Sequence, residues 1–133
     1  MPQSPEFEWS DAWVFCAVQW GGDDLSQVIG VGDMLNHAIL NLDEINRALA
    51  RLSTMGLVER VDGRISTSPD ATKLFDVLKT KRGGLFKQVD NMLVQLRKYA
   101  RNRDVVVQSG HIENVTEAEY NEAVRAYVGT AAP

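Results

Sequence analysis

The spacing of apolar residues between positions 42 and 54 predicts an amphipathic helix. Ile45, Leu49 and Leu52 recur at i, i+4 and i+7, so they fall on one face of an α-helix. Gly56 is expected to end this helix, because glycine adopts the left-handed conformation of a helix C-terminus without steric cost.

Two short strands are predicted after this helix, over residues 57–61 and 64–67. Asp62-Gly63 lies between them and is typical of a type I′ turn, in which both central residues have positive φ. The pattern of apolar and polar residues therefore predicts a helix that leads directly into a β-hairpin.

Five further helices are predicted from apolar residues at helical spacing and from their capping residues. They cover about residues 10–20, 24–38, 69–82, 85–102 and 117–128. Their expected caps are Ser10, Asp23 or Asp24, Ser68 with Pro69, and Thr116 with Glu119. The helix over residues 42–54 is expected to be capped by Asn41 with Glu44. The helix over residues 10–20 is apolar nearly all round, which indicates that it is buried. Residues 104–108 are expected to form a short strand. The predicted fold is a single domain over residues 1–133, mainly α with a small β-hairpin.

The helix, hairpin and following helix start resemble the winged helix-turn-helix module, closest to MarR-like and PadR-like bacterial regulators. The matching residues are Arg51, Leu52, Gly56, Leu57, Val58, Glu59, Arg60, Gly63, Arg64 and Thr67-Ser68-Pro69. The resemblance covers about residues 10–82 and leaves residues 85–128 as additional C-terminal helices. It implies a DNA-binding fold in which the helix over residues 42–54 is the recognition helix.

Five residues are candidates for DNA contact under this resemblance. Asn46, Arg47 and Arg51 lie on the outward side of the recognition helix and are able to bind base edges or phosphate. Arg60 and Arg64, on the hairpin, are candidates for contacts with the DNA backbone.

Asp43 and Glu44 depart from the pattern of a good DNA reader. They place negative charge at the end of the helix that should meet phosphates. An alternative interpretation of the same residues is that Asp43, Arg47 and Arg51 form a ladder of i, i+4 ion pairs on a solvated helix face.

Charge is distributed unevenly along the chain. Residues 1–46 carry eight acidic residues and no Lys or Arg, residues 47–103 carry thirteen basic and five acidic residues, and residues 104–133 carry one basic and five acidic residues. The basic middle is suited to face phosphates. The alternative is that the acidic ends fold against it and cancel its field.

The helix over residues 85–102 carries a wide apolar stripe that includes Phe86, Val89, Leu93 and Leu96. This spacing of three and four is typical of a helix that pairs with a second copy, so the stripe predicts a homodimer interface. The alternative is that the stripe packs against the chain's own helix over residues 10–20.

Sequence motifs give little support to an enzyme. The chain has no GxxxxGK[ST] or GxGxxG loop and no evident Ser, His and acid cluster, so neither a catalytic residue nor a cofactor is predicted. Cys16 is the only cysteine and is interpreted as a small core residue. His37 and His111 are too few for a predicted metal site, and a role at a helix end is favoured for His37.

Composition predicts a soluble globular chain. Hydrophobic residues make up 44% and charged residues 24%, and no apolar run is long enough to span a membrane. Without a secretory signal pattern at the N-terminus, a cytoplasmic location is expected.

Three classes of function remain open. The first is a DNA-binding transcriptional regulator that acts on double-stranded DNA as a homodimer. The second is a winged-helix protein–protein interaction module without DNA binding, because winged helices also serve as protein scaffolds. The third is a sensor whose unknown small-molecule ligand binds beside Trp9, Trp13 or Trp20, for which core packing is the alternative.

Overall fold

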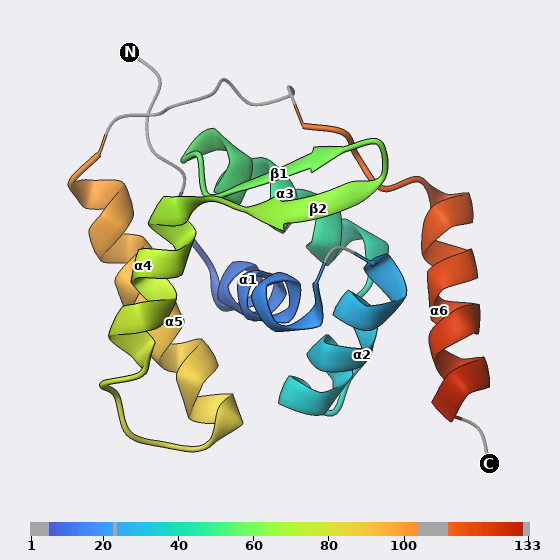
Figure 1. Ribbon diagram of the computed structural model, residues 1–133, viewed down its shortest axis with the longest axis horizontal. Coiled ribbons are helices and arrows are strands. Elements are labelled where there is room, and N and C mark those ends of the chain that lie inside the picture. The colour runs from blue at the N-terminus through green and yellow to red at the C-terminus, as the bar shows by residue number, and fades with distance from the viewer. Residues whose placement is uncertain (1–5, 23, 104–111, 132–133) are drawn as a thin grey trace.

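The computed structural model describes residues 6–22, 24–103 and 112–131, and within them the chain is mainly helical with one two-stranded hairpin (Figure 1). The elements are α1 (Trp9–Gly21), α2 (Leu25–Asn36), α3 (Leu42–Thr54), β1 (Val58–Val61), β2 (Arg64–Thr67), α4 (Pro69–Leu78), α5 (Leu85–Arg101) and α6 (Glu117–Ala131). The predicted fold class, mainly α with a small hairpin, is therefore confirmed. The strand predicted over residues 104–108 lies outside the described residues.

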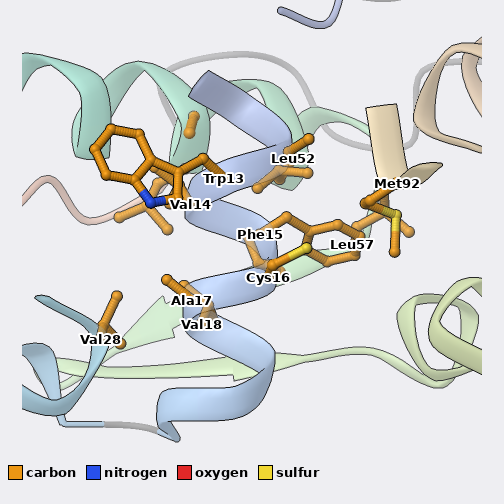
Figure 2. Close-up of a cluster of buried hydrophobic side chains, with 14 of the residues drawn as sticks. Trp13, Val14, Phe15, Cys16, Ala17, Val18, Val28, Leu52, Leu57 and Met92 are labelled. Atoms are coloured by element: carbon orange, nitrogen blue, oxygen red, sulfur yellow. The ribbon is translucent and has the colours of Figure 1, made fainter. Parts of the chain in front are cut away.

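Helix α1 lies in the middle of the molecule and contacts α2, α3, α5 and β2 (Figure 1). Every residue from Asp11 to Val18 is buried, as its apolar sequence predicted. Figure 2 shows its side chains surrounded by residues from other elements, including Val28, Leu52 and Met92. The core of the protein is thus built around one helix that has no solvent-facing side along these eight residues.

The hairpin has the turn that the sequence predicted. Asp62 and Gly63 have φ of 53° and 80°, and Val61 is the register partner of Arg64. Positive φ at both central residues gives the turn a twist that matches the two strands. Ile65, which is 2% exposed, anchors the hairpin in the core.

Helix α5 covers α1 and packs against α4. Val89 and Leu96 have no exposed surface within the single chain, and Leu93 is partly buried against the same core. The predicted homodimer interface is therefore wrong for Val89 and Leu96, because α1 needs an apolar cover on this side and the stripe of α5 supplies it. The side chain of Phe86 lies outside the described residues.

Helix α6 is joined to α2 and to the loop that follows it. Its start has the predicted capping box: Glu119 N donates to Thr116 Oγ1, and Thr116 N donates to Glu119 Oε1. Tyr120 donates its hydroxyl to the Leu40 carbonyl at 2.7 Å, and Tyr127 donates to Asp33 at 2.5 Å. These two hydrogen bonds hold α6 against α2 and against the loop that follows α2.

One helix start differs from the expectation, and one helix end agrees with it. Helix α1 begins at Trp9, with Glu8 and Asp11 forming its capping box, so Ser10 is not the N-cap. His37 is the C-cap residue of α2 in the left-handed conformation, with φ of 53°. The helix-end position favoured for His37 is confirmed.

Gly32 allows α2 to approach its neighbours closely. Its carbonyl accepts a 2.8 Å hydrogen bond from Trp13 Nε1, and a Cβ added at Gly32 would lie 2.7 Å from Leu40 Cδ1.

We expect Gly32→Ala to lower the free energy of unfolding by about 1–3 kcal/mol through overpacking, measured by urea denaturation. Gly129→Ala, where an added Cβ meets nothing within 4 Å, is the matched control and should have no destabilising effect. Equal stability of the two variants would contradict this account.

Candidate interaction site on α3 and the hairpin

The five predicted DNA-contact residues come from α3 and from the hairpin, and we call the surface formed by these elements the α3–hairpin face. Residues 112–119, which we call the C-terminal strap, run along this face past the hairpin and end in the first turn of α6 (Figure 1). Contacts with the strap decide what two of the five candidates are able to do.

Asn46 binds the backbone of the strap through both ends of its side-chain amide. Its Nδ2 donates to the Val115 carbonyl at 2.9 Å, and its Oδ1 accepts from the Val115 backbone N–H at 2.8 Å. Val115 itself is 3% exposed and belongs to the hydrophobic core cluster. The side chain that was predicted to contact a base edge instead binds the backbone of one residue of its own chain.

Arg60 is enclosed by the strap. Its side chain is 2% exposed, and its guanidinium donates to the Asn114 carbonyl at 2.8 Å and to Glu119 at 2.5 Å. Glu113 lies 3.0 Å from the same guanidinium. The guanidinium has almost no access to water, and a buried charge needs such partners to offset its desolvation. Two carboxylates and one carbonyl supply them here.

Glu113 also binds the turn of the hairpin. Its Oε1 accepts the backbone N–H of Gly63 at 2.9 Å. One carboxylate therefore joins the turn to Arg60, at the start of the strap. The strap as a whole is held by three kinds of group: a side-chain amide, a buried guanidinium and a backbone N–H.

Arg51 and Arg47 form ion pairs elsewhere on α3. Arg51 donates to Asp11, which has no exposed surface, at 2.9 Å, and it lies 3.5 Å from Glu8. Arg47 pairs with Asp43 at 3.2 Å. The predicted ladder is thus half correct, because Arg51 leaves it to compensate a buried carboxylate on α1.

Arg64 is exposed on the hairpin. The five candidates therefore do not form one cationic surface. Two bind the strap, Arg51 binds the start of α1, Arg47 binds its own helix, and Arg64 lies on the solvent side. Here the acidic ends of the chain do fold against basic residues of the middle, as the second interpretation of the charge pattern proposed.

The sequence interpretation missed Glu113, Asn114 and Val115 as parts of this site. Thr116 and Glu119 were recognisable as a capping box, but the second bond of Glu119 is with a residue 59 positions away. No local pattern marks such a partner. The excess of acidic residues after position 104 was the only signal in the sequence.

Other kinds of site find less support in the described part of the chain. Among those residues there is no group of three or more His, Cys, Asp or Glu placed to hold a metal ion, and no helix long and apolar enough to cross a membrane. Cys16 is completely buried, and burial raises the pKa of its thiol, which disfavours the reactive thiolate.

The three tryptophans do not share one environment. Trp13 is 3% exposed in the core, as the packing alternative proposed, and Trp9 donates its indole N–H to Asp90 at 2.7 Å. Trp20 is 42% exposed and borders an open depression of about 640 Å³ together with Met34. This depression is lined by one tryptophan, not by the set of three.

Comparison with protein-family models, with curated proteins and with solved structures finds no match to this chain.

The charge of Glu119 gives this site a pH dependence. Hydrogen bonding from the Thr116 backbone, and then from Arg60, lowers the pKa of Glu119 below its ordinary value of 4.5. Because the pKa is lowered on folding, the carboxylate stabilises the folded protein fully at any pH above its ordinary pKa, and this contribution is lost as the pH falls through the lowered pKa.

We expect wild type to have a higher free energy of unfolding than Glu119→Gln at neutral pH, and this difference should shrink as the pH falls below 4.5. Urea denaturation at a series of pH values measures it.

Glu122 supplies the control, because it is exposed and lies on the same helix about one turn further on. Glu122→Gln should show no such convergence with wild type. A difference between wild type and Glu119→Gln that stays constant across this pH range would contradict the assigned role of the carboxylate.

Proposed function

We propose that this protein is a winged-helix interaction module that binds polypeptide, not DNA, on its α3–hairpin face. The observation that carries this proposal is that the face already holds a polypeptide, the C-terminal strap, through bonds to its backbone. Asn46 bonds both the N–H and the C=O of Val115, and Arg60 bonds the carbonyl of Asn114. Groups arranged in this way recognise an extended chain.

The winged-helix part of the proposal is supported by the order of the elements. Three helices, a two-stranded hairpin and a further helix follow one another from α1 to α4. Gly56 after α3 and Gly63 in the turn have positive φ, and Ser68 with Pro69 begins α4, in agreement with the residues on which the resemblance was based. Because this fold hosts both DNA readers and protein scaffolds, the choice between them depends on the surface and not on the fold.

The state of the α3–hairpin face argues against DNA reading. Asn46 would have to give up two hydrogen bonds before it met a base edge, and Arg60 is covered by two carboxylates. Asp43 and Glu44 add negative charge at the start of α3, where a phosphate would approach. Each of these features opposes the approach of a polyanion to α3.

A second candidate function is supported by the outward side of α5. Lys87, Val94, Lys98 and Arg101 are all exposed and lie at i, i+7, i+11 and i+14, so they share one face of the helix. At a rise of 1.5 Å per residue they span about 20 Å. Residues 69–103 also carry nine basic and three acidic residues. This surface is suited to sequence-independent contacts with the phosphates of double-stranded DNA.

Binding to mixed-sequence duplex DNA, followed by fluorescence anisotropy over a range of salt concentrations, separates these functions. We expect no affinity that depends on α3. Arg47→Gln should leave the titration unchanged, and Asp43→Asn, which removes an opposing charge, should not create binding at low salt.

Three outcomes are informative. Binding that Arg47→Gln weakens, or that Asp43→Asn strengthens, overturns the proposal in favour of DNA reading by α3. Salt-sensitive binding that is lost only in the double variant Lys98→Gln/Arg101→Gln establishes the second candidate. Absence of binding in all variants leaves the polypeptide-binding function as the one consistent with the α3–hairpin face.

A further inference from the structure

We infer that the C-terminal strap is an internal competitor, and that the α3–hairpin face is the binding site for an acidic segment of a partner protein. This inference rests on the proposed function and adds the chemistry of the ligand and a means of regulation. The strap shows what the face accepts: an apolar residue, a carboxylate two positions before it and a second carboxylate four positions after it. In this chain the three positions are Val115, Glu113 and Glu119.

The apolar position is selected by burial and by backbone capture together. Val115 is 3% exposed, so a polar side chain placed there would lose water without a partner. Its N–H and C=O are both bonded to the amide of Asn46 at 2.8 and 2.9 Å. These two bonds hold the backbone of this residue in place against α3.

The acidic positions are selected by Arg60 and by the hairpin turn. Glu113 meets both the guanidinium and the backbone N–H of Gly63, and Glu119 meets the guanidinium from the first turn of α6. Since the Arg60 side chain is 2% exposed with the strap in place, any occupant without negative charge would leave a desolvated cation uncompensated. The face therefore prefers an acidic occupant to a neutral one.

The same residues explain why the partner must compete. The strap is part of the chain, so its concentration near the face is far higher than that of any free ligand. The apparent affinity for a partner is then reduced by the fraction of molecules in which the strap is displaced. Weakening the strap should consequently strengthen binding of a partner, whereas weakening the face should abolish it.

A phosphate backbone is a possible rival occupant, because it would also compensate Arg60. The burial of Val115 and the two hydrogen bonds between Asn46 and the backbone of that residue favour polypeptide instead. Duplex DNA is therefore included as an alternative ligand in the test.

The test uses the full chain and a labelled synthetic peptide with the sequence of residues 112–123, followed by fluorescence anisotropy. Glu113→Gln/Val115→Ser weakens the strap without changing the face. We expect this variant to bind the peptide at least about tenfold more tightly than wild type, because more of its molecules have an open face.

Matched variants in the same weakened-strap background locate the site. Asn46→Ala and, separately, Arg60→Met should each reduce peptide binding at least about tenfold, since a factor of ten corresponds to the loss of one good polar interaction. Lys98→Gln, on the outward side of α5, should have no effect. A peptide with glutamine at the positions of Glu113 and Glu119 should bind more weakly than the native peptide.

Amide hydrogen exchange on the wild-type chain tests the same inference without any substitution. The Val115 amide, which donates to Asn46, is protected only while the strap is bound. Excess peptide should accelerate its exchange, because the free peptide displaces the strap, while the amides of α3 keep their protection. Unchanged exchange at Val115 under saturating peptide would contradict displacement.

The outcomes separate this inference from the proposed function. Equal peptide affinity of wild type and the weakened-strap variant, or indifference to Asn46→Ala, overturns the inference but leaves the polypeptide-binding function in place if the peptide still binds. Tight binding of duplex DNA by the weakened-strap variant, lost in Arg60→Met and competed by the peptide, overturns both, because the strap would then cover a DNA-reading face.

Discussion

Burial of α1 on all sides is the constraint on which the rest of the structure depends. A helix that is apolar all round gains stability only if other elements cover every face, and each buried Phe or Val side chain contributes about 1.5–3 kcal/mol when it is covered. Helices α2, α3 and α5 and strand β2 supply this cover. The positions of these elements follow from the need to enclose one helix, and the α3–hairpin face is the outer surface that results.

Enclosure of α1 also accounts for a buried charge. The start of α1 places Asp11 in the interior, with no exposed surface, and Arg51 of α3 compensates it at 2.9 Å. The same cover removes the apolar stripe of α5 from solvent, which leaves that helix with a cationic outer side. A helix that looked suited to a second copy by its sequence thus serves the core of its own chain.

The C-terminal strap solves a second problem of desolvation. Arg60 and Asn46 have polar groups that the fold covers, and each finds its partners in the strap and not in water. The covered polar groups of α3 and of the hairpin are thus satisfied by a segment that is distant from them in the sequence.

The sequence by itself determined the elements whose causes lie within a few residues. Asn41 with Glu44, the Asp62-Gly63 turn, Ser68-Pro69 and Thr116 with Glu119 act through bonds spanning four residues or fewer, so their effects could be predicted one by one. Only the tertiary structure decided which charged residues meet. Arg60 pairs with a carboxylate 59 positions away, and Asn46 binds the backbone of a residue 69 positions away. Contacts over such separations depend on how helices are packed, because an exposed arginine and a buried one have the same local sequence signature.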